Sequence, residues 1–423
     1  MTSNFSLSRR QFLAGSAALS CAGVTGFAPL SGQTSSPVHI ESIERQTLWK
    51  NRDGKSLTWF HPRPCLVPKP EGGSFVLMTL QEISGSDYFG PVHWTRTDDL
   101  GKTWTEPELI PGFDRRDVPG HEGLKVGVCD VVPQYHPQTK TTLALGHCVF
   151  YRGRHFSRND QLSRYPTYCV RQADGTWSDR KKLVWNDPRG SHIYSNNCGQ
   201  RVVLPDGDIL LAFTFGPSAS ARMVAGVRCG YDGETLSVKE VGPPLTHDVK
   251  RGLLEPSMTA FQGRYYLTIR AEDDRGYVSV SEDGLNWGEK KPWTWDDGEP
   301  LTMSTTQQHW LTHSDGLYLV YTRKADHNAN VIRWRAPLWV AKVDPEKRVL
   351  IKETERVVHP LVGDGINDPD GVALMGNFHV VNVTPQESWV TVGEWMPRRK
   401  ARGNTLLARI EWSQPNAALA TLR

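Results

Sequence analysis

The chain has 423 residues, a formal net charge of +3 and a charged fraction of 22%. This small positive excess, with no basic stripe of interleaved aromatic residues, argues against a nucleic-acid-binding protein. The 38 glycines, 28 prolines and 15 tryptophans favour turn-rich β-structure with aromatic packing, and a chain of this length can form one large all-β domain.

The N-terminus is predicted to be an export leader over residues 1–33, followed by a single domain over residues 34–423. The segment SRRQFL at 8–13 resembles the twin-arginine export motif, and an uncharged stretch rich in alanine, glycine and serine follows it. Cys21 also allows a lipoprotein site, which Ala18 fits poorly. No later apolar run reaches membrane-spanning length, so we expect a periplasmic or secreted protein without a stable membrane span.

Six segments of one common shape follow along the chain. Each has a polar opening, one or two apolar residues, a short turn and a few residues suited to a strand. They lie at 62–81, 129–147, 196–215, 254–271, 305–324 and 377–395. Repeated β-rich segments at spacings of roughly 50 to 70 residues are typical of propeller blades with loop insertions. The sequence therefore predicts an all-β fold, a six-bladed β-propeller.

A shorter Asp-Gly hairpin motif occurs after several of these segments. It reads TDDLGKTW at 97–104, QADGTW at 172–177 and SEDGLNW at 281–287. In such a hairpin the aspartate caps backbone N–H groups, the glycine takes a positive φ angle and the tryptophan packs between neighbouring strands. These stretches resemble the Asp-box of the sialidase-like propellers, and the first copy is a full match.

Polar residues open the inner strand of each repeat, and such openings converge at the mouth of a propeller's central channel. The openings contain Arg63, Asp130, Asn196, Asn197, Glu255, Gln307 and His379, while Arg270 and Glu394 lie at the other ends of their repeats. Because a buried charge is costly without a partner or a ligand, this set predicts a polar site at the mouth.

The resemblance to sialidases extends to individual residues. The stretch FHPRPCLVP at 60–68 resembles the family's opening arginine motif and implies Arg63 as the first arginine. The stretch LEPSMTAFQGRYYLTIR at 254–270 resembles the family segment with Glu-Pro at one end and Arg at the other, which implies Glu255 and Arg270. The resemblance further implies Arg335 as the third arginine and Asp87 as the acid/base residue. Three guanidinium groups suit a substrate carboxylate.

One position departs from the family pattern. The tyrosine that sialidases use as nucleophile, activated by a glutamate, falls on Phe378, which has no hydroxyl group. Either the register differs, or a tyrosine such as Tyr194 substitutes, or the chemistry differs. In the last case the adjacent His379 is a candidate base, or Asp87 with Glu255 or Glu394 forms a carboxylate pair.

We therefore expect an exported sialidase-like enzyme that cleaves a terminal acidic sugar from a glycan. A lyase acting on uronate polysaccharides and a non-catalytic glycan-binding propeller are the alternatives. The expected partner is an acidic oligosaccharide. No sequence motif supports a cofactor or a metal site. Six cysteines remain after the leader without a fixed disulfide pairing, and the oligomeric state stays open.

Overall fold

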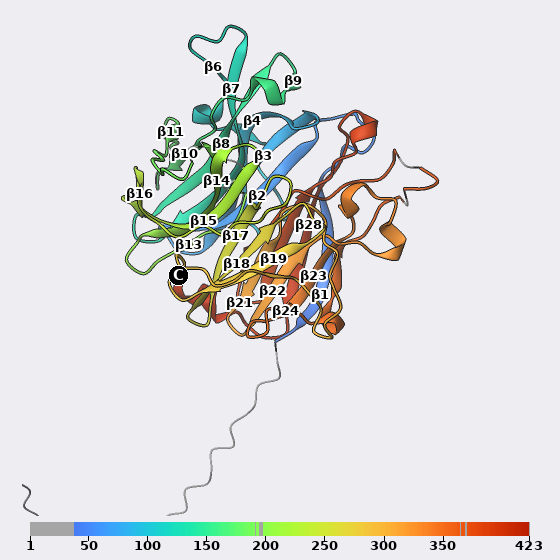
Figure 1. Ribbon diagram of the computed structural model, residues 1–423. Helices are drawn as coiled ribbons and strands as arrows, with labels where there is room; N and C mark the ends of the chain where they lie inside the picture. Colours follow the sequence, from blue (N-terminus) through green and yellow to red (C-terminus); the bar gives the residue numbers. More distant parts are fainter. Residues whose placement is uncertain (1–37, 191, 194–197, 364, 369, 423) are drawn as a thin grey trace, which may run out of the picture. The chain divides into compact units, whose positions relative to one another are not determined.

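The computed structural model describes residues 38–422 with the exception of 191, 194–197, 364 and 369. Within these residues the chain forms six antiparallel sheets and almost no helix. The sheets are the blades of a six-bladed β-propeller, which confirms the predicted fold class (Figure 1). The predicted leader with Cys21 lies outside the described residues, as do Tyr194, Asn196 and Asn197.

The first three blades each take two inner strands from one predicted segment. Blade 1 contains β2 (Trp59–Pro68), β3 (Ser74–Gly85), β4 (Tyr88–Thr97) and β5 (Glu108–Leu109). Blade 2 contains β6 (Arg116–Asp117), β7 (Leu124–His136), β8 (Thr141–Arg152), β9 (His155–Phe156), β10 (Pro166–Arg171) and β11 (Lys181–Lys182). Blade 3 contains β12 (His192–Ile193), β13 (Val202–Val203), β14 (Ile209–Ser218), β15 (Ala221–Tyr231) and β16 (Leu236–Val241).

The last three blades follow the same plan. Blade 4 contains β17 (Leu254–Phe261), β18 (Arg264–Arg270), β19 (Gly276–Ser281) and β20 (Lys291–Pro292). Blade 5 contains β21 (His309–His313), β22 (Gly316–Tyr321), β23 (Leu338–Asp344), β24 (Val349–Leu350) and β25 (Arg356–His359). Blade 6 contains β26 (Phe378–Asn382), β27 (Glu387–Gly393), β28 (Thr405–Trp412) and β1 (Ile40–Trp49).

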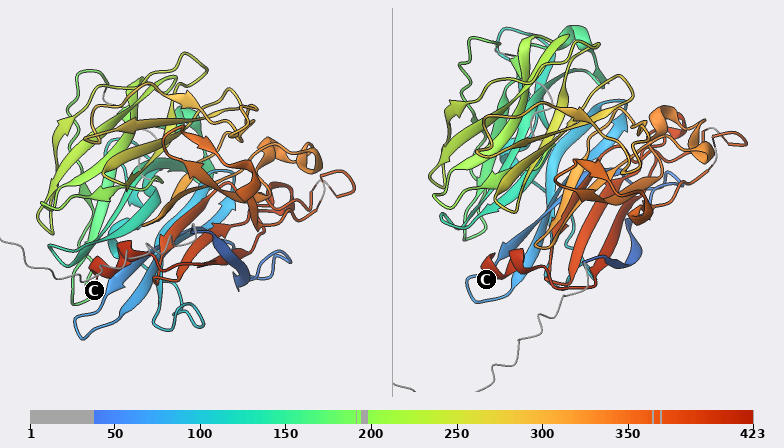
Figure 2. Two further views of the ribbon diagram at one scale, coloured as in Figure 1. Left: turned by 90° about the horizontal axis from the view of Figure 1, so that it is seen from below. Right: turned by 60° about the horizontal axis from the view of Figure 1, so that its bottom comes forward.

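Blade 6 combines strands from both ends of the described chain. β1 pairs antiparallel with β28, with Ile43 opposite Ile410 and Leu407 opposite Gln46. The blue β1 accordingly lies beside red C-terminal strands in Figures 1 and 2. Since this pairing joins the first strand to the last blade, it closes the ring without a free seam.

Short 3-10 helices sit in the connections between strands. They are η1 (Pro111–Phe113), η2 (Arg158–Asp160), η3 (Asp326–Asn328), η4 (Ile332–Trp334), η5 (Lys352–Thr354), η6 (Pro397–Arg399) and η7 (Ala417–Leu422). Among the described residues no helix is long and apolar enough to cross a membrane.

The hydrophobic core lies between the faces of neighbouring blades. One cluster joins blades 5 and 6 through residues such as Val340 and Val390, and another joins blades 2 and 3 through Leu145 and Phe213. Strands such as β14 are buried along most of their length, because both faces of a blade are covered. The six cysteines of the described part are buried free thiols.

The first Asp-Gly hairpin links β4 and β5 within blade 1, and its tryptophan packs against the neighbouring blade. Asp99 accepts hydrogen bonds from the backbone N–H of Thr103 at 2.9 Å and from its hydroxyl group at 2.6 Å. Gly101 has a φ angle of 76°. Trp104, which ends this hairpin of blade 1, packs against Trp389 of blade 6 with ring centroids 6.1 Å apart. The tryptophan thus contributes to the interface between two blades.

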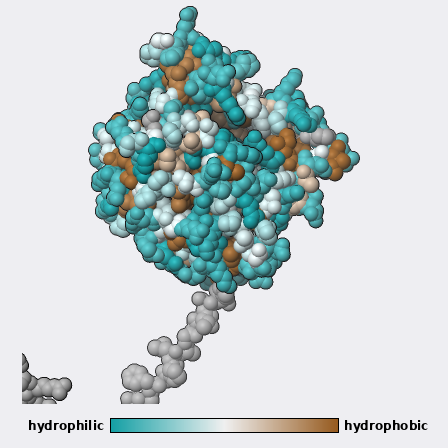
Figure 3. Space-filling model, viewed as in Figure 1, coloured by the Kyte–Doolittle hydropathy of each residue, from teal (hydrophilic) through white to brown (hydrophobic). Residues whose placement is uncertain are grey.

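The surface is mainly hydrophilic. Figure 3 shows small, scattered hydrophobic patches on a largely hydrophilic face. The large apolar side chains that are exposed in the described part are Leu57, Leu100, Leu109, Val184, Ile332 and Ile366. Scattered residues of this kind are normal for a globular protein and indicate no extended apolar interface.

Candidate functional site

The inner strands of blades 1, 2 and 4 carry the same irregularity near the mouth of the channel. The pairing of each with its neighbour shifts by one residue, between Phe60 and Arg63 in β2, between Cys129 and Val132 in β7, and between Leu254 and Ser257 in β17. A strand that places two residues opposite one partner residue forms a β-bulge, and bulges redirect side chains near active sites.

A charged or titratable residue occupies the first bulge position in all three blades. His61, Asp130 and Glu255 have φ angles of 51°, 56° and 41°. This left-handed conformation is unfavourable for residues other than glycine, and strain of this kind is concentrated at functional sites. The three bulges therefore give equivalent positions at the mouth to an imidazole and two carboxylates.

Arg63 and Asp130 form the centre of a charge-balanced group between blades 1 and 2. The Arg63 Nη2 donates to Asp130 Oδ1 at 2.6 Å, and Nη1 donates to the carbonyl oxygen of Cys198 at 3.1 Å. The side chain of Arg63 is 1% exposed and that of Asp130 is 17% exposed. Burial alone would raise the pKa of Asp130, but the neighbouring His61 and Arg63 lower it to about 2. Asp130 is therefore ionised at neutral pH.

His61 completes this group as a neutral side chain. Its Nε2 lies 3.6 Å from Asp130 Oδ1, and its Nδ1 lies 3.3 Å from Gln81 Oε1. Burial lowers the pKa of His61 to about 4, against the opposing effect of Asp130. The arginine and the aspartate thus balance each other, and the imidazole can accept a proton.

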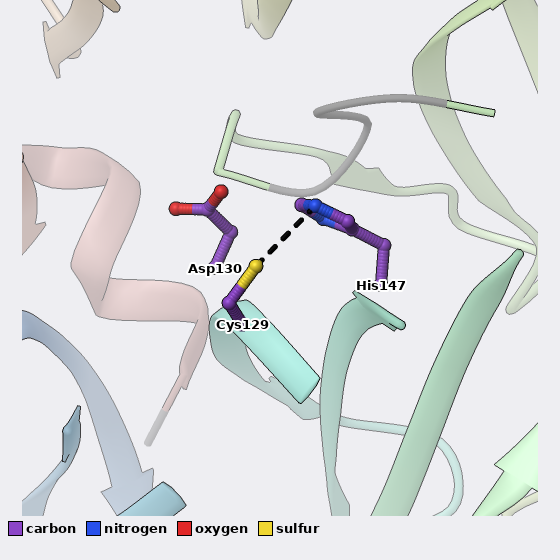
Figure 4. A group of neighbouring side chains, drawn as sticks. All are labelled: Cys129, Asp130 and His147. Carbon is purple, nitrogen blue, oxygen red and sulfur yellow. Dashed lines mark hydrogen bonds between the residues drawn. The ribbon is translucent and has the colours of Figure 1, made fainter. Parts of the chain in front are cut away.

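A cysteine and a histidine lie directly beside Asp130. Cys129 Sγ is 3.4 Å from His147 Nε2, and Figure 4 shows the thiol pointing at the imidazole ring. The donor atoms of Cys129, Asp130 and His147 all lie within 4.8 Å of one another, close enough to surround one cation. However, Arg63 already supplies a positive charge to Asp130. We therefore describe Cys129 and His147 as hydrogen-bonded support for the Asp130 bulge.

A second group of charges connects blades 4 and 5. Arg270 Nη1 donates to Glu255 Oε1 at 2.6 Å, and its Nε donates to the Thr305 hydroxyl group at 3.0 Å. Arg335 Nη2 donates to the carbonyl oxygen of the same Thr305 at 3.2 Å. The structure therefore brings Arg270, Glu255 and Arg335 together around Thr305.

Arg335 has no acidic partner among the described residues. Its Nε is buried and makes no hydrogen bond there. Burial, followed by the positive charges of Arg270 and Arg333, lowers the pKa of Arg335 to about 9, while Glu255 and Asp87 act in the opposite direction. The carbonyl oxygen of Arg335 accepts a hydrogen bond from Met375 N at 2.6 Å, which helps to fix this arginine against blade 6.

The backbone before Arg335 is also strained. Arg333 and Trp334 have φ angles of 54° and 49°. Gly376 of blade 6 lies directly against Arg335, since a Cβ atom at this glycine would come within 2.8 Å of Arg335 Cδ. A glycine is thus required for the close approach of blade 6 to the arginine.

Further charged residues surround the second group. Arg251 donates from Nε to Glu272 Oε2 at 2.8 Å, and Glu272 lies 3.9 Å from Arg270. The hydrogen bond from Arg251 is the main reason that the pKa of Glu272 falls to about 2. The first and second groups meet near the buried Cys198, whose thiol is influenced electrostatically by Glu255, Asp130, Arg63 and Arg270.

Asp87 lies in the hairpin turn between β3 and β4. Its φ angle is 53° and its side chain is exposed. Its charge acts on His61, on Arg251 and on Arg335. Asp87 is therefore within electrostatic range of both groups, and exposure leaves its carboxyl group accessible from solvent.

His379 and Phe378 lie deeper in the propeller. His379 is 3% exposed, and its ring centroid is 4.8 Å from that of His309. Burial, followed by His309 and Arg63, lowers the pKa of His379 well below its ordinary value. Phe378 is fully buried in the core between blades 5 and 6. Its ring therefore packs with apolar residues of the core and against the ring of His309, with centroids 5.2 Å apart.

Glu394 belongs to a separate buried ion pair. It is fully buried, and Arg52 binds both of its oxygen atoms, with Nε donating to Oε2 at 2.7 Å. The backbone N–H of Asn404 also donates to Oε2, at 3.0 Å. The structure thus places Glu394 with Arg52 at the edge of blade 6 and not with Arg270 and Arg335.

Sequence reasoning did not assign roles to His61, to Asp130 or to the Arg251–Glu272 pair. Aligning the repeats at HPR, DVV and EPS would have placed His61, Asp130 and Glu255 at one position. The bulges confirm that these three residues are equivalent. Arg251 lies outside the six repeated segments, so aligning the repeats does not single it out.

No protein-family model matches the chain, and no curated protein matches it. Solved structures do share its fold. A protein of unknown function from Dyadobacter fermentans superposes with a TM-score of 0.61 at 16% identity, covering 89% of this chain and 99% of its own. A Hadza microbial sialidase superposes with a TM-score of 0.60 at 14% identity, covering 87% of this chain and 68% of its own.

The sialidase of Trypanosoma rangeli has the same architecture. It superposes with a TM-score of 0.57 at 14% identity over 87% of this chain, which spans 59% of the length of that enzyme. At these identities the similarity establishes the fold and no more. The described residues form a six-bladed β-propeller of the kind found in sialidases.

Proposed function

We propose that this protein is an exported carbohydrate-active enzyme that binds the carboxylate of a terminal acidic sugar and cleaves that sugar from a glycan. The observation that carries the proposal is Arg335, a buried guanidinium group beside Arg270 that has no acidic partner in the described part of the chain. Of these two neighbouring cations only Arg270 binds a carboxylate of the described residues, that of Glu255, which acts on Arg335 through its charge alone. A ligand carboxylate would remove this imbalance.

The guanidinium geometry supports a carboxylate as the ligand group. Arginine presents parallel N–H donors that match the two oxygen atoms of a carboxylate, and such charge-assisted pairs are the stronger hydrogen bonds in proteins. In the proposal Arg335 and Arg270 bind the ligand carboxylate directly. The two terminal nitrogens of Arg63 donate to Asp130 and to the carbonyl oxygen of Cys198, so in the proposal Arg63 holds Asp130 in place.

Two kinds of carboxyl group suit the cleavage step. Asp87, which is exposed above the site, can donate a proton to the leaving sugar oxygen. Asp130 is ionised, and Glu255 is held by Arg270, so each can stabilise positive charge at the anomeric carbon. A water molecule then adds to that carbon and gives a proton back to the Asp87 carboxylate, which completes the hydrolysis. The Trypanosoma rangeli sialidase has been solved in complex with sialic acid, which supports an acidic sugar as the substrate class.

A lyase acting on a uronate is the second candidate function. The observation that favours it is the neutral His61 next to Asp130, because an unprotonated imidazole can remove the proton beside a neutralised carboxylate.

The tyrosine nucleophile of sialidases has no counterpart beside these arginines in the described part of the chain. There no tyrosine hydroxyl group hydrogen-bonds to Arg63, Arg270 or Arg335, and Tyr194 lies outside that part.

The two candidates predict different products. Purified protein is incubated with sialosides and with uronate-terminated oligosaccharides, while released sugar and the ultraviolet absorbance of a new C=C bond are followed together. Release of a saturated acidic sugar supports the hydrolase, and an unsaturated uronate supports the lyase. Binding of these sugars without any product would contradict both and leave a glycan-binding propeller. The Asp87→Asn variant is expected to reduce hydrolysis by about 100-fold or more.

Export through the twin-arginine route is part of the same proposal. Expression in a bacterium with that route should give a protein in the periplasm or medium that lacks the leader, as N-terminal sequencing can establish. Replacing Arg9 and Arg10 by lysine should keep the full-length chain inside the cell. Export that is unaffected by these replacements would contradict the proposed route.

A further inference from the structure

A cavity with a volume of about 470 Å³ lies where β2 and β7 end. His61 and Arg63 lie in the first half of β2 and Asp130 lies at the middle of β7, and none of them lines this cavity. We call it the blade 1–2 cavity and define it by the lining residues Lys69, Phe75, Tyr135, Lys140, Arg171 and Gln172. Its lining is independent of the residues assigned to the proposed function.

Arg171 is the unusual member of this lining. The residue is 9% exposed, and its guanidinium carbon lies 5.1 Å from the ring centroid of Trp94 and 5.5 Å from that of Phe75. Its Nε is buried without a hydrogen-bond partner. Among the described residues its guanidinium group forms neither an ion pair nor a hydrogen bond, although buried arginines are normally paired.

The neighbouring cations Lys69 and Arg96 each have an acidic partner, whereas Arg171 has no ion pair in the described part of the chain. Lys69 lies 2.7 Å from Asp98, and Arg96 lies 3.0 Å from the same carboxylate. Burial lowers the pKa of Arg171, and repulsion from Arg96 lowers it further. Asp98 is therefore shared by Lys69 and Arg96, whereas Arg171 has no ion pair in the described part of the chain, and Asp174 opposes its charge only at longer range.

The rest of the lining adds positive charge and mixed polarity. No Asp or Glu is among the described residues that line the cavity, while Lys140 is exposed there and has no ion pair in the described part of the chain. Tyr135 and several prolines supply apolar surface, and Gln172 supplies polar groups. A sugar ring has an apolar face and hydroxyl groups that suit such a lining, whereas a simple inorganic anion would use only the cations.

We propose that the blade 1–2 cavity is a second ligand site, which binds the carboxylate of an acidic sugar through the Nη atoms of Arg171, with Lys140 adding charge and Tyr135 contacting the ring. A site at this end of the propeller would attach the enzyme to an acidic glycan while the candidate site acts elsewhere on the same or another chain. Such a second contact raises the effective concentration of substrate.

Calorimetry with glucuronate, methyl glucoside and sulfate tests this proposal. To isolate the cavity, binding is measured in an Arg335→Met variant and again after adding Arg171→Met. We expect glucuronate to bind the first variant and to bind the double variant at least tenfold more weakly, with methyl glucoside weak in both. Equal glucuronate binding by the two variants would overturn the proposal. Sulfate that binds as tightly as glucuronate would also overturn it, because the site would then recognise only an anion.

A second variant covers the case in which Arg171→Met does not fold. Lys140 is exposed, so Lys140→Glu should leave the unfolding midpoint unchanged and weaken glucuronate binding severalfold. Unchanged binding in Lys140→Glu would contradict the proposed role of the cavity. Trp94 fluorescence provides an independent reading, because this ring contacts Arg171 and should respond to glucuronate but not to methyl glucoside.

Discussion

The two charge groups at the mouth of the propeller differ in their balance. Between blades 1 and 2, one arginine faces one aspartate, and His61 is neutral. Between blades 4 and 5, Arg270 binds Glu255, and Arg335 binds no carboxylate in the described part of the chain. The charges of the first group therefore balance within the protein, whereas the second group has one positive charge more than its glutamate can balance, among the described residues.

This difference in charge balance helps to distinguish an arginine with a structural role from one that binds a ligand. Both Arg63 and Arg335 are buried and both lie near the channel, so burial alone does not distinguish them. Their hydrogen-bond partners do, because Arg63 donates to Asp130 and to a carbonyl oxygen, whereas Arg335 donates only to the Thr305 carbonyl oxygen among the described residues. In the proposed function Arg63 therefore has a structural role and Arg335 binds the ligand.

The largest expected effect is the loss of Arg63. The Arg63→Met variant leaves the buried Asp130 without its main partner, which should lower the free energy of unfolding by about 3–5 kcal/mol. Denaturant unfolding measures this change. The matched control is Arg264→Met, whose partner Glu346 is 68% exposed, and the expected loss there is below about 1 kcal/mol. Similar losses in both variants would contradict the structural role of Arg63.

Acidification should disturb the balanced group through His61. Its folded pKa is about 4 and its ordinary value is 6.5, so the unfolded chain binds the proton first as the pH falls. Stability is then lost between pH 6.5 and 4, by about 3 kcal/mol for this residue. Unfolding at pH 7 and pH 4.5 should show a smaller loss for His61→Gln than for the wild type. His121→Gln, at an exposed histidine, should behave as the wild type.

Removing the excess charge should affect binding and spare the fold. The Arg335→Met variant should bind a carboxylated sugar about 30-fold more weakly, or about 2 kcal/mol, because a charge-assisted hydrogen bond is lost. Its unfolding free energy should not fall, since no acidic partner in the described chain is left unpaired. Calorimetry and denaturant unfolding together test this prediction, and a variant that unfolds easily but binds normally would reverse the two assignments.

The smallest effect is expected for a substitution that keeps the positive charge at residue 270 but changes the geometry of its hydrogen-bond donors. Arg270→Lys should weaken binding of a carboxylated sugar by about fivefold, or about 1 kcal/mol, since lysine replaces a two-pronged donor by a point charge. Binding of the neutral counterpart should hardly change. Equal losses for the carboxylated and the neutral sugar would contradict a carboxylate contact at Arg270.

The sequence was sufficient for the blades but not for every site residue. Each repeat contains a strand, a turn and a second strand, and this local pattern determined the inner hairpins of all six blades. β1 was not predicted, because its pairing with β28 is a contact between chain ends. The bulges at His61 and Asp130 depend on pairing register, which alternation of apolar residues does not reveal.

Long-range partners limited the prediction of the site. Glu394 ended a repeat just as Arg270 did, yet its partner Arg52 lies 342 residues away in the chain, and no local pattern indicates that contact. The nucleophile position fell on Phe378 when the family pattern was laid on the last repeat, and the structure shows that side chain in the core. Whether an arginine keeps free donors depends on tertiary contacts, so Arg335 and Arg63 looked alike in sequence.

The most direct test of the central claim compares two ligands that differ only in charge. Calorimetry on the wild-type protein should measure binding of an acidic sugar and of the same sugar with its carboxylate converted to a carboxamide. We predict that the carboxylate form binds at least tenfold more tightly and that the difference disappears in the Arg335→Met, Arg171→Met double variant. Equal affinity of the wild type for the two ligands would contradict the claim that the unpaired arginines, Arg335 and Arg171, bind a carboxylate.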